Sequence, residues 1–469
     1  MSSQEVQSVD HSSNKAVYRW AGAVLLVAVL LRLVLWELYS PVTYSDTPSY
    51  YRSAQAVRDG FTSYDGTRTP GYPLFLAFFG SDQHVWLAQM GLGVAITMLF
   101  FYLGWRLSGQ AWFGGLVALA HTLNLGQLFF EANLLTETLT TFWIVLTLAG
   151  LLFWLTTPRR RSFWLAAGLG FASAMAALTR PLFIYLPAWV LLFILFSRET
   201  VPAQAQPSGA QSGQPVNHSP RLIIHWIPAL SFLVPVLLIL GGWLSFIHSR
   251  FGDWSLTTMT GYHLVQHTGS FFEYVPDEYA SLRDTYITFR DAHIARYGTQ
   301  TNTIWEAIPA MQQASGLSFY DLSRVLASIS IQLIRGHPDL YLANVLNGWW
   351  LFWRAPVYWS ATALRWAELA RPVLLLVQLE RLLLAGINLL FIASSVLALI
   401  FHQRLPVSGG RRNFLYCLLG TVWIASILQT MIDHGDNPRF LLPLQSLVVF
   451  WVLWTGWQVF MLRKSTGES

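Results

Sequence analysis

Long apolar stretches alternate with shorter polar segments along almost the whole chain. Most are about 20 residues long, the length that a helix needs to cross the hydrocarbon core of a bilayer. The first stretch follows Lys15 and Arg19 and lacks a small-residue cleavage site, so we interpret it as a retained span rather than a signal peptide. We therefore expect about ten transmembrane helices, near residues 17–39, 84–104, 111–130, 137–156, 162–178, 181–197, 222–247, 380–401, 413–432 and 440–461.

Basic residues fall mainly in short loops on one side of this topology, the side that the positive-inside rule assigns to the cytoplasm. With the N-terminus inside, these are Arg106, Arg159 to Arg161, Arg198, Arg221, Arg404, Arg411, Arg412, Arg463 and Lys464. Two long hydrophilic regions, 40–83 and 249–371, then lie on the extracytoplasmic face. The segment 338–359 is also apolar, but one more crossing would carry the loop 404–412 outside, so we expect an interfacial or re-entrant helix there.

The composition agrees with a membrane protein: 54% of the 469 residues are hydrophobic and 11% are charged, against about 25% charged in a soluble domain. The net charge of +5 comes from loops, and the longest basic run is PRRR at 158–161, so we do not expect nucleic acid as a partner. The single cysteine, Cys417, lies in an apolar stretch and cannot form an internal disulfide.

The two hydrophilic regions contain predicted amphipathic helices. In the second region, apolar residues recur at helical spacing from Leu282 to His293, and Ser318 with Asp321 forms a capping pattern for a helix that ends at Gly336. In the first region, Tyr50, Ala54 and Val57 define one face of a helix that ends before Gly60. Asp46 directly precedes this helix, and capping its free N–H groups is one role for the Asp46 carboxylate.

Several motifs, taken in order, suggest another role for Asp46. Asp46, Tyr50 and Ala54 in the first external loop are followed by RTPGYP at 68–73, by Glu137 in LLTETL, by Arg180 in ALTRP and by Arg439 in PRFLLP. This series resembles the GT-C membrane glycosyltransferases, and most closely the branch of protein O-mannosyltransferases and bacterial aminoarabinose transferases. The resemblance covers most of 15–200 and 410–460. Some GT-C members carry two adjacent acids in this loop, whereas here Ser45 precedes a single Asp46.

The resemblance implies an inverting glycosyltransferase in the cytoplasmic membrane, with its active site on the extracytoplasmic face. The donor would be a sugar on a polyprenyl phosphate, and the acceptor a hydroxyl of a lipid, glycan or protein. Asp46 would be the general base, and Arg68 and Arg439 would bind the donor phosphate. Two other interpretations remain: a surface salt bridge of Arg68 with Asp65 and interfacial snorkelling of Arg439.

Further residues are candidates for contacts to the sugar or acceptor, or for structural support: Tyr50, Tyr72, Glu137, Arg180, His263, Gln266 and His267. Glu137 begins a predicted span, so it either complements the helix dipole or pairs with Arg180, because a lone charge there would be costly. His263 and His267 lie four residues apart, but a third ligand is missing, so we expect no metal or other cofactor, although a divalent ion remains possible.

The predicted fold class is an all-α polytopic membrane protein of the GT-C type, with two extracytoplasmic loop regions containing amphipathic helices. Its predicted parts are an N-terminal transmembrane module at 1–200 with the external loop 40–83, a flexible cytoplasmic linker at 200–220, a transmembrane helix at 221–248, an extracytoplasmic region at 249–371 and C-terminal transmembrane helices at 372–469. Alternative functions are a lipid or glycan transporter or flippase, which predicts inverted repeats and broken helices at the bilayer midplane, and a polysaccharide polymerase.

Overall fold

The computed structural model describes residues 3–157, 161–196, 226–355, 357–401, 407, 409–435 and 437–466. These residues are helical almost throughout, and their one β-type contact is an isolated bridge between Val42 and Asn133. The predicted all-α class is therefore confirmed. The predicted linker at 200–220 lies outside the described residues.

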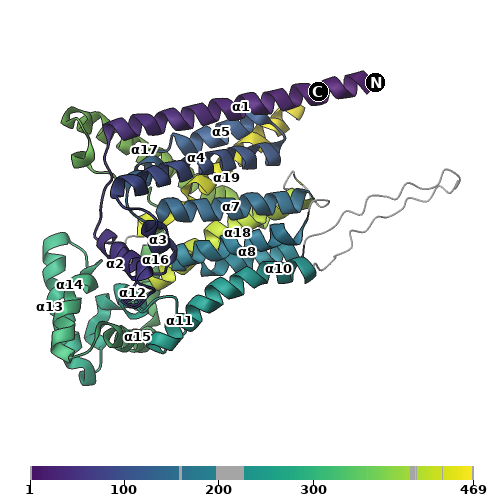
Figure 1. Cartoon of the computed structure of the whole chain (residues 1–469). Coiled ribbons are helices and arrows are strands. Elements are labelled where there is room, and N and C mark those ends of the chain that lie inside the picture. Colours follow the sequence, from purple (N-terminus) through teal and green to yellow (C-terminus); the bar gives the residue numbers. More distant parts are fainter. Residues whose placement is uncertain are drawn as a thin grey trace.

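Seven helices in the described part of the chain are long and apolar enough to cross a bilayer. They run side by side along one direction (Figure 1). In chain order, the elements that form them are α1 (Ser3–Leu38), α4 (Asp82–Ser108), α7 (Glu137–Thr156), α10 (Trp226–Val236) continued through η3 (Leu237–Gly241) into α11 (Gly242–Phe251), α17 (Ala370–Ile400), α18 (Gly409–Ile432) and α19 (Asn437–Thr466).

The other three predicted spans are also helical, but each is short or bent. α5 (Ala111–Thr122) and α6 (Leu125–Ala132) meet at an angle of 54°, so together they form one broken span or a re-entrant loop. α8 (Phe163–Thr179) and the segment of η2 (Pro181–Tyr185) and α9 (Leu186–Leu195) are shorter apolar helices. A multi-pass membrane protein is thus supported, whereas the count of ten spans stays a prediction.

The remaining helices lie together at one end of the bundle (Figure 1). The longer ones are α2 (Thr47–Arg58), α3 (Gly71–Ala77), α12 (Thr260–Thr268), α13 (Ala280–Tyr297), α14 (Thr303–Ser315), α15 (Phe319–Gly336) and α16 (Pro338–Phe352). Short helical turns accompany them: η4 (Gly269–Tyr274), η5 (Asp277–Tyr279), η6 (Ala361–Ala363) and η7 (Ala367–Leu369). The N- and C-termini lie at the opposite end, so the two hydrophilic regions share one face, which we call the outer end.

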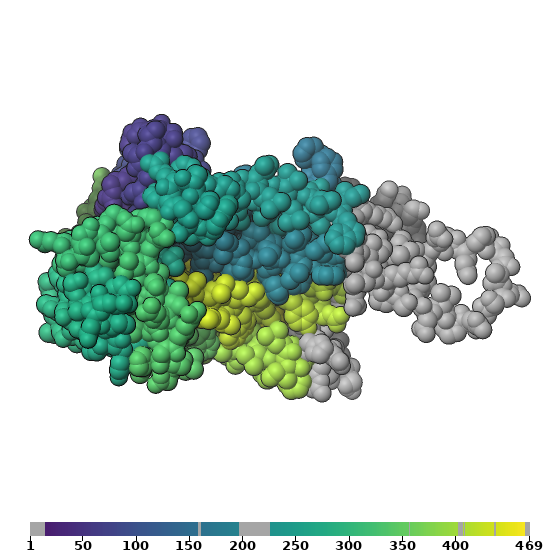
Figure 2. Space-filling view, turned by 90° about the horizontal axis from the view of Figure 1, so that it is seen from below, coloured from purple at the N-terminus to yellow at the C-terminus, as the bar shows by residue number. Residues whose placement is uncertain are grey.

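The outer helices have a hydrophobic core of their own. Buried side chains of α12 to α15, including Tyr262, Tyr286 and Leu326, form a cluster separate from the large cluster among the long helices. The predicted cap of α15 is present, because Ser318 Oγ accepts a hydrogen bond from the Asp321 backbone N–H. Figure 2 shows residues 260–350, in green, gathered as a bulky mass at one end of the molecule.

Candidate active site

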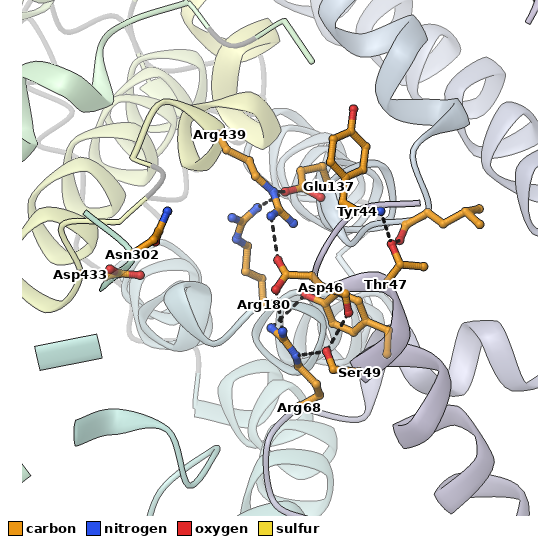
Figure 3. A network of polar contacts seen from close by, with 12 residues as sticks. Tyr44, Asp46, Thr47, Ser49, Arg68, Glu137, Arg180, Asn302, Asp433 and Arg439 are labelled. Carbon is orange, nitrogen blue, oxygen red and sulfur yellow. Dashed lines mark hydrogen bonds and ion pairs between the residues drawn. The ribbon is translucent and has the colours of Figure 1, made fainter. Parts of the chain in front are cut away.

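Asp46 lies between α1 and α2, at the outer end of the bundle. It occupies the N-cap position of α2, but its carboxylate makes no capping hydrogen bond, so the capping interpretation is wrong. Instead, Oδ1 accepts a hydrogen bond from Arg68 Nη2 at 2.7 Å and Oδ2 accepts one from Arg439 Nη1 at 2.8 Å (Figure 3). The carboxylate thus bridges arginines from opposite ends of the sequence.

Arg68 is held by the helix that follows Asp46. Its Nε donates to Ser49 Oγ at 2.8 Å, and its guanidinium lies 4.6 Å from the centre of the Tyr50 ring. Tyr64 fixes the loop by donating its hydroxyl to the Arg68 carbonyl at 2.6 Å. The alternative partner, Asp65, accepts hydrogen bonds from Thr67 and forms no ion pair with Arg68, so the predicted Arg68–Asp65 surface pair is wrong.

Arg439, in the first turn of α19, joins Asp46 to a second, deeper carboxylate. Its Nε donates to Glu137 Oε1 at 2.5 Å, and Arg180 Nη1 donates to the same oxygen at 3.1 Å. Glu137 is completely buried at the start of α7. The predicted Glu137–Arg180 pair is therefore confirmed. Arg439 binds two carboxylates and does not extend toward the membrane–water interface, as the snorkelling interpretation required.

This cluster, which we call the arginine–carboxylate network, carries an excess of positive charge. It contains three arginines (68, 180 and 439) and two carboxylates (46 and 137), so its formal charge is 3 − 2 = +1. Burial of Asp46 opposes its ionisation, but the charges of Arg68 and Arg439 outweigh this effect and hold the pKa of Asp46 well below its usual range. Its side chain is still 31% exposed, so an anion of the right size can approach.

A cavity of about 440 Å³ adjoins the network. Ser49 and Arg68 line one side of it, and Trp305, Phe319 and Tyr320 of the outer helices line another. Asp46 is not in the wall of the cavity but is one hydrogen bond away from it, through Arg68. The network is therefore connected to a space large enough for a small ligand.

The two candidate tyrosines have different surroundings. The Tyr50 hydroxyl is 3.5 Å from Arg68 Nη1, so Tyr50 belongs to the network. Tyr72 is fully buried behind it, with ring centres 5.2 Å apart, and donates to Gln89 Oε1 at 2.9 Å. Gln89 in turn donates to two backbone carbonyls of the α6 region. Tyr72 therefore supports the site rather than facing it.

The α12 candidates lie apart from the network. His263 Nδ1 is 3.1 Å from Asp433 Oδ2, and Gln266 exchanges two hydrogen bonds with Asn302. His267 is buried beside them, and burial together with the nearby His434 lowers the pKa of His267 to about 4, so its ring is neutral at physiological pH. His263 therefore joins α12 to the turn between α18 and α19, and Gln266 joins α12 to the start of α14.

No group of three or more His, Cys, Asp or Glu side chains that could hold a metal occurs among the described residues. The expected absence of a metal or other cofactor therefore stays a prediction.

A second buried ion pair was not predicted. Arg32 of α1 donates to Glu131 Oε1 of α6 at 2.5 Å, and both side chains are at most 3% exposed. Arg32 also donates to Thr122 Oγ1 at 2.8 Å. A charged residue in a predicted span usually has a partner or a function, so Arg32 itself was the signal in the sequence.

We compared the chain with protein-family models, with curated proteins and with solved structures, and found no match in any of the three.

Proposed function

We propose that this protein is an inverting glycosyltransferase that moves a sugar from a polyprenyl-phosphate donor to an acceptor hydroxyl on the extracytoplasmic side of the cytoplasmic membrane. One observation carries the proposal: a partly exposed carboxylate, Asp46, is held between two arginines at the outer end of the bundle. These are the groups that a displacement at a phosphate-linked sugar requires, a base on one side and cations for the departing phosphate on the other.

In the proposed reaction, the acceptor oxygen attacks the anomeric carbon of the sugar as its proton passes to Asp46. The bond between that carbon and the phosphate oxygen breaks, and the electron pair leaves with the phosphate. A phosphate is stable as an anion, so no second carboxylic acid is needed to protonate it, in contrast to the leaving group of a glycosidase. Arg68 and Arg439 then meet the charge that develops on the phosphate, for which the forked guanidinium is well suited.

The ion pairs explain how one site can both supply a base for the acceptor hydroxyl and bind the departing phosphate. A strongly acidic Asp46 is a weak base while both arginines are bonded to it. A donor phosphate competes for the same arginines, and the excess positive charge of the network favours this anion. Once the arginines turn toward the phosphate, the pKa of Asp46 rises and the carboxylate becomes a better proton acceptor.

The proposal is tested by mass spectrometry of glycolipids, glycans and glycoproteins from cells with and without the gene for this chain. The expected result is a sugar substituent that disappears with the gene and returns with a plasmid copy, while the unmodified acceptor accumulates. If every glycan is unchanged, or if only the amounts of whole glycolipids change with no sugar missing, the transferase proposal is wrong, and the second outcome would favour a flippase.

A further inference from the structure

The cavity beside the network is formed between the two hydrophilic regions of the chain. Arg52 of α2 and Thr67 of the following loop line one side, and Trp305 of α14 and Phe319 of α15 line the other. None of the residues that line it belongs to the seven candidate spans. A polyprenyl tail has to lie against the bilayer, so this cavity suits a water-borne ligand and not the lipid of the donor.

One wall of the cavity is aromatic and held in place. The Trp305 and Tyr262 rings are 5.9 Å apart, and the Tyr262 and Phe319 rings are 4.7 Å apart. The Tyr262 hydroxyl donates to the Phe319 carbonyl at 2.5 Å, which holds these tilted rings together. Beside it, Tyr320 donates to Asp253 Oδ2 at 2.6 Å. Trp305 and Phe319 line the cavity and are held in place by Tyr262 behind them, so an apolar face that packs against them costs little side-chain entropy.

The part of the cavity lining that comes from α2 supplies a positive charge, Arg52. Arg52 is exposed on α2, and no ion pair or hydrogen bond joins its guanidinium to any other residue in the described part of the chain. The carboxylate of Asp65 also lines the cavity and keeps its charge, but it accepts its hydrogen bond from Thr67 at 2.6 Å and forms no ion pair with Arg52 among the described residues. Arg52 is therefore available to an anion in the cavity, whereas Arg68 is already bonded to Asp46.

We propose that this cavity binds the acceptor, and that the acceptor is a carbohydrate bearing an anionic group such as a carboxylate. A sugar ring has a C–H face that fits the aromatic wall and a rim of hydroxyls for the polar groups, and Arg52 binds the anionic substituent. Arg68 lines the cavity and is bonded to Asp46, so a ligand against Arg68 lies one residue away from the proposed base. The identification as acceptor rests on the proposed transferase function.

Saturation-transfer NMR on the full-length protein in nanodiscs tests the proposal with three probes: cellobiose, its carboxylated counterpart cellobiouronic acid, and a serine-phosphorylated peptide. Wild type is expected to bind cellobiouronic acid more tightly than cellobiose. Arg52→Ala should weaken the carboxylated disaccharide about tenfold or more and leave cellobiose unchanged, because one charged contact is lost. Trp305→Ala should weaken both sugars. Arg335→Ala, at an exposed arginine of α15 away from the cavity, is the matched control.

Three results would overturn the inference: no binding of either disaccharide, equal effects of Arg52→Ala and Arg335→Ala, or Arg52-dependent binding of the phosphopeptide in place of the sugars. Asp46→Asn separates the two proposals, since it should retain disaccharide binding while lowering the transfer rate about 10²-fold or more. If the disaccharide binds but the cells show no missing sugar, the cavity is a carbohydrate site and its role as an acceptor site is refuted.

Discussion

Asp46 has both carboxylate oxygens bonded to arginine, and this arrangement sets how it responds to pH. Its pKa in the folded protein lies below that of an unfolded chain, about 4, chiefly because the pull of Arg68 and Arg439 exceeds the cost of burial. The ion pairs therefore stabilise the fold above that ordinary pKa, and this contribution is lost as the pH falls through the lower, folded value.

Arg68→Gln removes one of the two cations and raises the pKa of Asp46. If the transferase proposal is right, the wild-type protein should show no loss of kcat/KM from Asp46 protonation above about pH 5, and the variant should lose activity at a higher pH than wild type does. The measurement is the pH profile of kcat/KM, with Arg335→Gln as control. An acidic limb at the same pH in wild type and Arg68→Gln would show that Arg68 does not set the pKa of the base.

Arg439 contacts both carboxylates of the network and, in the proposal, the donor phosphate. Arg439→Ala should weaken binding of undecaprenyl phosphate more than Arg439→Lys does, because lysine retains the charge but loses the paired hydrogen bonds. Lysine should still bind less tightly than arginine. Binding to protein in nanodiscs is the measurement, with Arg463→Ala at the other end of α19 as control. Wild-type affinity in both Arg439 variants would refute phosphate binding by this residue.

At the scale of elements, a close contact between α3 and α8 positions two of the arginines. A side chain on Gly71 would overlap the backbone of Leu178 and Thr179, at 2.6 to 2.7 Å. Arg68 lies just before Gly71, and Arg180 directly follows Thr179. Only glycine allows the two segments to approach this closely.

Gly71→Ala should therefore destabilise the protein by about 1–3 kcal/mol, since α3 must move away from α8, and it should lower transferase activity as the arginines separate. Thermal unfolding in detergent and the transfer rate are the measurements. Gly91→Ala on α4 is the control, because nothing lies within 4 Å of the added carbon. Equal unfolding temperatures for the two variants would mean that the α3–α8 contact is not tight.

Much of the element order could be predicted from the sequence, because apolar length and helical periodicity are local signals. The ends of α2 and α15 and the cap of α15 followed from the same signals, whereas the predicted Asp46 cap of α2 is absent. The Asp46–Arg439 contact joins residues almost 400 positions apart, and only the resemblance brought them together. Arg32 indicated that a partner exists, but Glu131 lies 99 positions away, so no local pattern identified it as that partner. The bend between α5 and α6 falls at Asn124, whose side chain caps α6 by accepting a hydrogen bond from the Gln127 backbone N–H, a local signal that was missed.

At the scale of the whole molecule, the network and the cavity are built from residues of one end of the bundle, and the chain termini lie at the other end (Figure 1). The predicted topology puts the network outside the cytoplasm. In a Cys417→Ser background, Ser281→Cys on α13 should react with a membrane-impermeant maleimide in intact cells. Gln110→Cys, in the turn between α4 and α5, should react only after permeabilisation. Both positions are exposed. The reverse labelling pattern would place the network on the cytoplasmic side.

The central claim is that Asp46 accepts the proton of the attacking hydroxyl. The most direct measurement is the single-turnover rate of sugar transfer by purified wild type and Asp46→Asn, with donor binding and unfolding temperature measured on the same samples. Asp59→Asn, at an exposed carboxylate of the same loop bonded only to Gln55 among the described residues, is the control. We predict a fall of about 10²-fold or more for Asp46→Asn with donor binding retained, and no change for Asp59→Asn. Transfer at the wild-type rate by a folded Asp46→Asn protein would contradict the account.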